Sequence, residues 1–332
     1  MNRIKRGWKK ISEIDELMLI VALVVIIIIM SLMSEYFFTG KNLMNVLRQS
    51  STTLIAATGM TLLLLVGEVD LSIGSLAAFS AVIMVDVMNM TQAILPAVLV
   101  AIGIGVGVGL FNAFVVTKFN IASLIVTLGV MTSVRGFAYI YTNAIAIQNT
   151  VDGFTVIGNG YVGPIPIPVI IAAVLFVLCY FLLKYTTFGR YIYASGDNKN
   201  AALASGINVN KIKTITFVLC SVFAVISGII LTARVNSGQP NLAQGFEFTV
   251  IAAVILGGTS LSGGQGTLIG TLVGVLILGV LDNGLVLNDV SSFWQDVVRG
   301  AVIILAVIID TRRTQKREKI SRRLVEQGAV SQ

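Results

Sequence analysis

Residues 17–33 read LMLIVALVVIIIIMSLM, an uncharged apolar run interrupted by one serine. A helix needs about 20 such residues to cross the roughly 30 Å hydrocarbon core of a bilayer, so this run predicts a transmembrane helix. Nine further apolar runs follow along the chain, at 50–66, 71–89, 93–117, 121–142, 164–183, 212–233, 247–258, 266–281 and 296–310. We therefore expect an all-α, polytopic transmembrane helical bundle with about ten spans.

The composition supports a membrane protein and argues against an enzyme. Of the 332 residues, 56% are apolar and 12% are charged, whereas about a quarter of the residues in a soluble domain are charged. Histidine is absent, which excludes a histidine base, nucleophile or metal ligand. We expect no catalytic site, no metal and no cofactor, and we interpret Cys179 and Cys220 as packing residues within apolar runs.

The basic residues predict the orientation in the membrane, because Lys and Arg gather on the cytoplasmic side. With ten spans and a cytoplasmic N-terminus, 18 of the 23 basic residues fall on that side. This predicts a basic cytoplasmic N-terminus at 1–16, a transmembrane domain at 17–311 and a basic cytoplasmic tail at 312–332. The small-residue cleavage site of a signal peptide is missing after the first run, which favours an uncleaved anchor. Since the charges flank apolar runs, no nucleic-acid partner is expected.

Two places predict broken or re-entrant helices. The runs at 50–66 and 71–89 are separated only by Gly67-Glu68-Val69-Asp70, and the run at 247–258 is short and followed by a glycine-rich stretch. Irregular backbone at membrane depth is tolerated only where it is buried in protein or lines a wet cavity. Both places therefore point to a permeation path.

Charged residues at membrane depth are costly unless they are paired or face water. Asp296 and Arg299 have the spacing of a neutralising pair on one helix. Asp70 lies close to the hydroxyls of Ser72 and Ser75. Its carboxylate could cap a helix that begins at the next residue, or it could lie directly on a solute path. The residues alone leave both interpretations open.

Residues 261–265 read LSGGQ, like the signature peptide of ABC-type ATPases. That peptide acts on ATP held by a phosphate-binding loop of the G-x-x-x-x-G-K-[ST] type, and this chain contains no such loop. We interpret the match as a flexible turn between two apolar runs.

The longest polar segment inside the chain, 184–213, is predicted to be cytoplasmic. Residues 201–206 favour a short helix that ends at Gly206. The next seven residues mix apolar and basic side chains, which fits either a solvated loop or a short surface helix that docks a partner protein.

Four stretches of the sequence resemble a known family, the permease subunits of bacterial ABC importers for ribose and related pentoses. The resemblance extends over about 17–311, and its most specific parts are GRYIYA at 189–194, SGINVNKIK at 205–213, AAVILGGTSL at 252–261 and DLSIGS at 70–75. The family often has Gly-Ile-Asp where this chain has Gly67-Glu68-Val69-Asp70. This additional carboxylate is a departure from the family pattern.

The resemblance implies a multi-pass protein of the bacterial inner (plasma) membrane that works as a pair of permease copies. Two cytoplasmic ATPase subunits would use ATP, and an extracytoplasmic sugar-binding protein would deliver a neutral monosaccharide, ribose or a related pentose. The segment 184–213 would then contact the ATPase. Its candidate coupling residues are Ser195, Asn198, Ala201, Ala202, Ser205, Gly206, Ile207 and Lys211.

A neutral sugar has no charge to select, so we expect hydroxyls, amides and aromatic faces along its path, at the interface of the two copies. The candidate path residues are Asp70, Ser72, Ser75, Thr127, Gln239, Phe246 and Asn283. The alternative is a secondary transporter or channel driven by an ion gradient. Against it, the successive spans contain no clear series of titratable residues.

Overall fold

The computed structural model describes the backbone of residues 2–305, 307, 308, 311 and 312, and side chains from residue 17 onward within these ranges. The basic side chains predicted for the N-terminal segment, and those of the tail after residue 312, lie outside the described part.

The described chain is a bundle of helices, which confirms the prediction of an all-α polytopic fold. Its long helices are α1 (Asn2–Met33), α2 (Gly40–Leu65), α3 (Ile73–Thr91), α4 (Ile94–Phe119), α5 (Ser123–Thr142), α7 (Ile167–Tyr185), α10 (Val209–Val235) and α12 (Leu268–Leu287). The shorter helices are α6 (Val156–Asn159), α8 (Thr187–Asp197), α9 (Lys199–Ala204) and α11 (Phe246–Leu256). A further helical segment covers residues 292–305.

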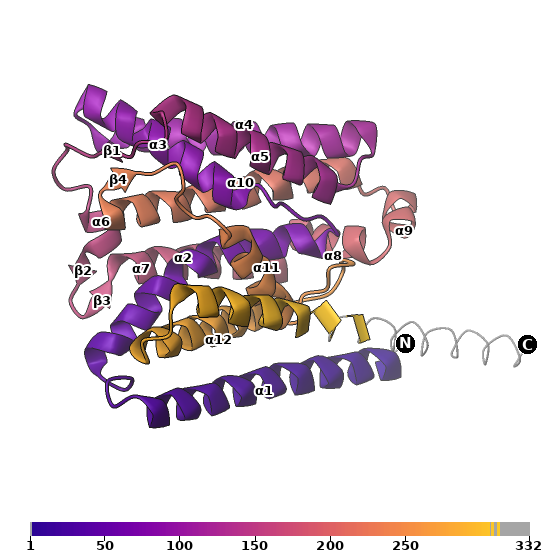
Figure 1. Ribbon diagram of the computed structural model, residues 1–332. Coiled ribbons are helices and arrows are strands. Elements are labelled where there is room, and N and C mark those ends of the chain that lie inside the picture. Colours follow the sequence, from indigo (N-terminus) through magenta and orange to yellow (C-terminus); the bar gives the residue numbers. More distant parts are fainter. Residues whose placement is uncertain (1, 306, 309–310, 313–332) are drawn as a thin grey trace, which may run out of the picture.

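Four strands of two residues each lie among these helices. β1 (Ile147–Gln148) pairs with β4 (Ser237–Gly238), and β2 (Tyr161–Val162) pairs with β3 (Ile165–Pro166), both antiparallel. The strands and α6 lie at one end of the bundle, and α8 and α9 lie at the other (Figure 1). We call these the strand end and the α8–α9 end.

Six of the described helices are long and apolar enough to cross a membrane, namely α3, α4, α5, α7, α10 and α12. Two shorter apolar helices, Leu17–Met33 and Phe246–Leu256, add to them. All ten apolar runs of the sequence lie largely in helical backbone within the described residues. These observations support a polytopic membrane protein, whereas the number of crossings stays a prediction.

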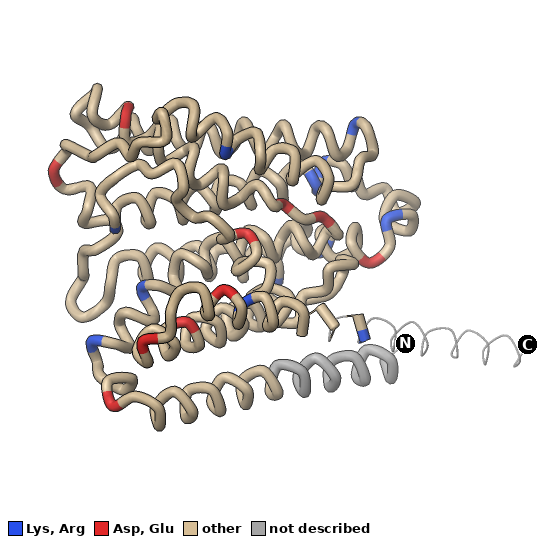
Figure 2. Tube along the Cα trace, in the orientation of Figure 1, with Lys and Arg blue, Asp and Glu red and all other residues tan. Residues whose placement is uncertain are grey.

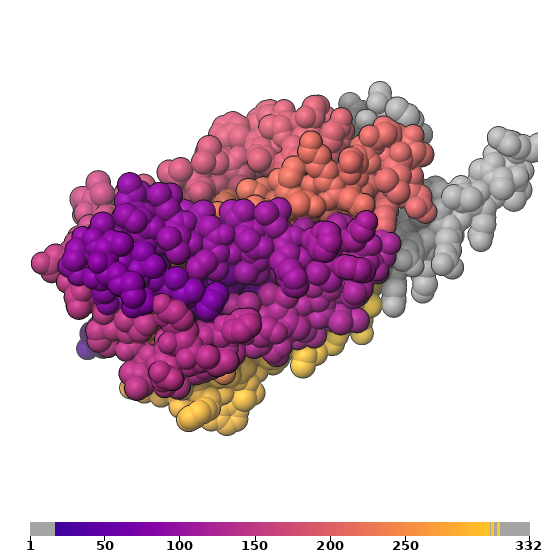
Figure 3. Space-filling view, turned by 90° about the horizontal axis from the view of Figure 1, so that it is seen from above, coloured from indigo at the N-terminus to yellow at the C-terminus, as the bar shows by residue number. Residues whose placement is uncertain are grey.

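The helices lie side by side, with α1 packed on α12 at one side and α3, α4 and α5 at the other (Figure 1). The space-filling view shows α3, α4 and α5 covering one face of the molecule (Figure 3). Large apolar side chains are exposed on α4 and α5, among them Phe111, Phe114, Ile125, Phe137 and Ile140. A broad apolar surface of this kind fits contact with lipid. The charged residues lie mostly toward the two ends, with a few inside the bundle (Figure 2).

Helix α2 is the buried centre of the bundle, in contact with α7, α10, α11 and α12. Its hydroxyls are satisfied internally, since Thr58 donates to the carbonyl of Leu54 and Thr61 to that of Ala57, each at 2.7 Å. A helix surrounded by protein need not be apolar throughout. Helix α2 can therefore include polar residues at its start. It begins at Gly40, whereas the apolar run predicted a start at residue 50.

Glycines allow α4 to approach α10 closely. A Cβ atom at Gly105 would lie 2.8 Å from Val225 Cγ2, and one at Gly109 would lie 2.8 Å from Val218 Cα. A Cβ atom at Gly103 or Gly107 of the same helix would meet nothing within 4 Å, so the close contact with α10 is made on the side of α4 that carries Gly105 and Gly109.

Candidate functional site

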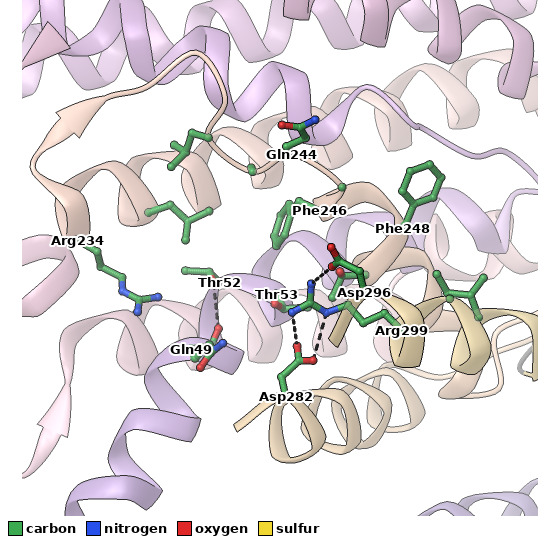
Figure 4. A pocket seen from close by; sticks show the side chains of 17 residues that line it. Gln49, Thr52, Thr53, Arg234, Gln244, Phe246, Phe248, Asp282, Asp296 and Arg299 are labelled. Atoms are coloured by element: carbon green, nitrogen blue, oxygen red, sulfur yellow. Dashed lines mark hydrogen bonds and ion pairs between the residues drawn. The ribbon is translucent and has the colours of Figure 1, made fainter. Parts of the chain in front are cut away.

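A cavity of about 830 Å³ lies between α2, the end of α10, α11, α12 and the segment 292–305 (Figure 4). Its wall combines amides, hydroxyls and aromatic rings, contributed by Gln49, Gln244, Thr52, Thr53, Thr249, Phe246 and Phe248. Small-molecule sites have volumes of about 300–1,000 Å³ and a few well-placed polar groups. This cavity can therefore accommodate a small polar ligand.

The short helix α11 shapes one wall of the cavity. Gly245, at φ 75°, precedes α11 and turns the chain so that the helix starts only at Phe246. Arg135 of α5 binds the loop that precedes α11. Its Nη1 donates to the carbonyls of Pro240 at 2.7 Å and Leu242 at 2.8 Å. The loop is thus fixed although it has no regular secondary structure.

A charged cluster forms another part of the wall. Arg299 Nε and Nη2 donate to the two carboxylate oxygens of Asp282, each at 3.2 Å, and Arg299 Nη1 donates to Asp296 Oδ1 at 3.1 Å. The pairing of Asp296 with Arg299 was predicted from their spacing and is confirmed. Asp282 was not predicted as a partner, since it lies on a different helix. Figure 4 shows the cluster at the opposite side of the cavity from Arg234.

The guanidinium of Arg234 makes no hydrogen bond or ion pair within the described part of the chain, and Arg48 lies close enough for their charges to interact. Its guanidinium lines the cavity. The sequence did not single out Arg234, because this residue follows a long apolar run and has the position of an ordinary charge at a helix end.

The structure distributes the predicted path residues over several places. Phe246 lines the large cavity, and Gln239 lines a second cavity of about 370 Å³ beside Tyr139. Thr127 is fully buried, and its Oγ1 donates to the carbonyl of Ser123. Asn283 exchanges two hydrogen bonds of 2.9 Å with Asn42, which joins α12 to α2.

The remaining three, Asp70, Ser72 and Ser75, form a fully buried group at the break between α2 and α3. Asp70 Oδ1 accepts hydrogen bonds from the backbone N–H of Ser72 at 2.8 Å and from its hydroxyl at 2.5 Å. Asn112 of α4, which was not predicted, donates to Asp70 Oδ2 at 3.3 Å. Helix α3 begins at Ile73, two residues later than the capping interpretation assumed. The carboxylate therefore closes the turn that leads into α3.

The two predicted breaks contact each other at the α8–α9 end, which the sequence did not show. The backbone N–H of Gly264, in the second break, donates to the carbonyl of Leu65 at 2.9 Å. A Cβ atom at Gly263 would lie 2.8 Å from the nitrogen of Gly67. Helix α8 packs against both, since a Cβ atom at Gly196 would lie 1.9 Å from the Leu65 carbonyl oxygen and 2.5 Å from the Gly264 nitrogen.

The predicted coupling residues surround α9. Asn198 caps this helix by accepting from the N–H of Ala201 at 3.0 Å, and Gly206, at φ 79°, ends it as predicted. The N–H groups of Gly206 and Ile207 donate back to the carbonyls of Leu203 and Ala202, which is the Schellman arrangement. The remaining candidates divide by exposure: Ser205 and Lys211 are exposed, whereas Ser195 and Ala202 are buried.

A bundle of membrane-length helices with broken segments and a polar cavity defines a membrane transport protein. The chain belongs to the family described as the permease component of the branched-chain amino acid transport system, whose model matches residues 42–307. It is therefore a transport subunit rather than an enzyme, and a multi-pass protein of the inner membrane.

Several characterised proteins are similar to this chain over most of its length. The ribose import permease protein RbsC of Escherichia coli K12 is 43% identical over 285 residues, which are 85% of this chain and 89% of the relative. RbsC of Bacillus subtilis is 43% identical, with 84% and 87% covered, and the L-arabinose ABC transporter permease protein AraH of Azospirillum brasilense is 37% identical, with 85% and 83% covered. No solved structure matches the chain.

Proposed function

We propose that this chain is the transmembrane permease subunit of an ATP-driven importer that carries ribose or a closely related pentose. The relatives named for ribose and arabinose support a sugar as cargo. The observation that carries the proposal in the structure is the cavity of about 830 Å³. Its Asp282–Arg299–Asp296 cluster is paired internally, so most of the groups free to bind a ligand are uncharged.

The cavity chemistry suits a neutral polyol. Gln49 and Gln244 each offer an amide donor and acceptor, and the hydroxyl of Thr249 can donate and accept. The hydroxyl of Thr52 donates to the carbonyl of Gln49 at 3.0 Å and can still accept from a ligand. Phe246 offers an aromatic face against which the C–H groups of a sugar ring can pack. Of the predicted path residues, Phe246 thus has the most direct role in this proposal. Asp70, Ser72 and Ser75 act on the path through the position of α3.

The proposed arrangement in the membrane has ten crossings and both termini in the cytoplasm. The transmembrane domain is 17–311, between the basic segments 1–16 and 312–332. The distribution of basic residues supports this orientation. It also agrees with the direction of α1, which starts at the α8–α9 end and runs toward the strand end (Figure 1).

The proposed assembly holds two copies of this chain, two cytoplasmic ATPase subunits and an extracytoplasmic sugar-binding protein. ATP is used by the ATPase subunits, and this chain needs no cofactor of its own. The segment 184–213 docks the ATPase through the exposed side of α9, around Asn198, Ala201, Ser205, Gly206 and Lys211. ATP binding drives transport because the ATPase has different affinities for the two states of the permease.

Reconstitution in proteoliposomes tests the proposal. The chain is incorporated with its ATPase subunits, ATP is enclosed on their side, and labelled ribose is supplied with the binding protein. We expect uptake that requires ATP and persists when ionophores collapse all ion gradients. Uptake that continues without ATP and stops with the ionophores would instead establish the secondary transporter.

A further inference from the structure

Glu68 is the carboxylate by which this chain departs from the family pattern, and the structure places it away from the large cavity. It lies in the break between α2 and α3 and forms an ion pair with Lys213 of α10. The side chains of Lys213 and Glu68 are only 15% and 9% exposed. Because water and salt have little access, the attraction between these charges is screened less than that of a surface pair.

Lys213 is connected rigidly to the proposed ATPase-docking segment. Helix α9 ends at Ala204, and α10 begins at Val209, so Lys213 is the fifth residue of α10. The short connection between the helices is held by the Schellman arrangement at Gly206 and by Asn208, whose side chain accepts from the N–H of Lys211 at 3.0 Å. A displacement of α9 is therefore passed to Lys213 without a flexible linker.

Glu68 is connected just as directly to the start of α3. The N–H of the next residue, Val69, donates to Ser123 Oγ of α5 at 3.1 Å. Asp70 follows, and its carboxylate closes the turn into α3. Only Val69 thus separates Glu68 from Asp70, the residue that positions α3, and α3 packs against both α4 and α5.

The second break has its own contact with the docking segment. Tyr193 of α8 donates its hydroxyl to the carbonyl of Gly266 at 2.9 Å. Burial raises the pKa of Tyr193 to about 12, so the hydroxyl keeps its proton at neutral pH. Helix α8 also packs closely against the backbone of both breaks at Gly196. Within the described residues, Glu68–Lys213 is the one ion pair between segment 184–213 and either break.

We infer that the Glu68–Lys213 pair transmits movement of the ATPase-docking segment to the start of α3, and that Glu68 is a positioning residue for transport. This inference rests on the proposed function. Removing one partner leaves the other charge buried and unpaired, and the break can then separate from α10. ATP hydrolysis continues in that case, but less of it drives transport.

The test measures sugar uptake and ATP hydrolysis together, in proteoliposomes that contain the whole transporter. The variants are Glu68→Gln, Lys213→Met, and the double charge exchange Glu68→Lys with Lys213→Glu. We expect each single variant to lower the sugar moved per ATP by about fivefold or more, the lower end of typical coupling between sites. The exchanged pair should return the ratio to within about twofold of the unchanged protein.

Tyr141→Phe is the matched control, because it removes the hydrogen bond from Tyr141 to Asp86 on helices α5 and α3, away from segment 184–213. The amount of sugar moved per ATP should not change in this variant. The ratio is measured per ATP, so a smaller amount of assembled transporter does not alter it. An unchanged ratio in both single variants, or an exchanged pair no better than the worse single variant, would overturn the inference.

A second readout separates this inference from the identity of the cargo. Stimulation of ATP hydrolysis by the sugar-loaded binding protein reports coupling whichever sugar is carried. If the unchanged transporter takes up no ribose, the proposed cargo is wrong, and the stimulation still decides the role of the pair. The stimulation of ATP hydrolysis should fall about fivefold in the single variants and return to its original value in the exchanged pair.

Discussion

Gly196→Ala should damage the contact between α8 and the two breaks. A Cβ atom at this position would lie 1.9 Å from the carbonyl oxygen of Leu65, whereas ordinary contact begins at 3.4 Å, so about 1.5 Å of movement is needed. The obstacles are backbone atoms, which cannot rotate away as a side chain could. Overpacking of this kind costs about 1–3 kcal/mol. The movement also breaks the hydrogen bond from Gly264 to Leu65, a further loss of about 1 kcal/mol.

Alanine is the better helix former by up to about 1 kcal/mol, which offsets part of this loss because Gly196 lies within α8. The expected net loss is about 2 kcal/mol, or a fall of roughly 3 °C in the melting temperature of the purified protein. Since α8 contacts both breaks here, ATP-driven uptake should fall as well. Thermal melting in detergent and uptake in proteoliposomes measure the two effects.

Gly107→Ala is the matched control, as a helical glycine of α4 whose Cβ atom would meet nothing within 4 Å. It should melt at the same temperature as the unchanged protein or slightly above it, and it should transport normally. If Gly196→Ala also behaves in this way, the close contact of α8 with the breaks has no energetic importance and the reasoning is refuted.

Three further predictions test the site and the docking segment. Asp70→Ala should destabilise the protein by about 2–4 kcal/mol, because three donors, the N–H and hydroxyl of Ser72 and the amide of Asn112, lose a buried acceptor. Asp70→Asn should lower the melting temperature less, since its amide oxygen can still accept from Ser72 and only its NH2 group faces the Asn112 amide. Gly206→Glu should abolish co-purification with the ATPase while membrane insertion stays normal, because it places a charged side chain on the exposed docking surface and strains the turn that ends α9 at φ 79°; an intact complex would contradict the docking assignment. Phe246→Ala should raise the KM for sugar uptake about tenfold, with unchanged protein levels, and an unchanged KM would remove this ring from the path.

The fold was predicted well from hydropathy where helices face lipid and less well where they face protein. Helices α4 and α7 have apolar residues on nearly all sides, and their extents follow the apolar runs closely. Helix α2 is surrounded by other helices, and its first ten residues include Lys41, Asn42 and Arg48. Hydropathy reports the average surroundings of a residue, so it cannot distinguish a polar loop from the polar start of a buried helix.

The site was harder to predict, because its contacts join residues that are far apart in the sequence. The pair of Asp296 with Arg299 was found since both lie on one helix, but Asp282 was missed. The hydrogen bonds between Asn42 and Asn283 join residues that are 241 positions apart in the sequence. A local signal for the cavity did exist, because Gly245 stands directly before α11 and marks where the helix must begin.

The LSGGQ peptide at 261–265 has a structural explanation in the meeting of the two breaks. Gly263 and Gly264 have φ angles of 86° and 72°, which favour glycine, and neither has room for a side chain. Gly263 lies against Gly67 of the first break, and Gly264 lies against Asp197 at the end of α8. The glycines are therefore required for three backbone segments to pack at one point, and nucleotide chemistry is not needed to account for them. Because the packing leaves no space at Gly196, Gly263 or Gly264, α8 cannot shift toward either break without displacing both.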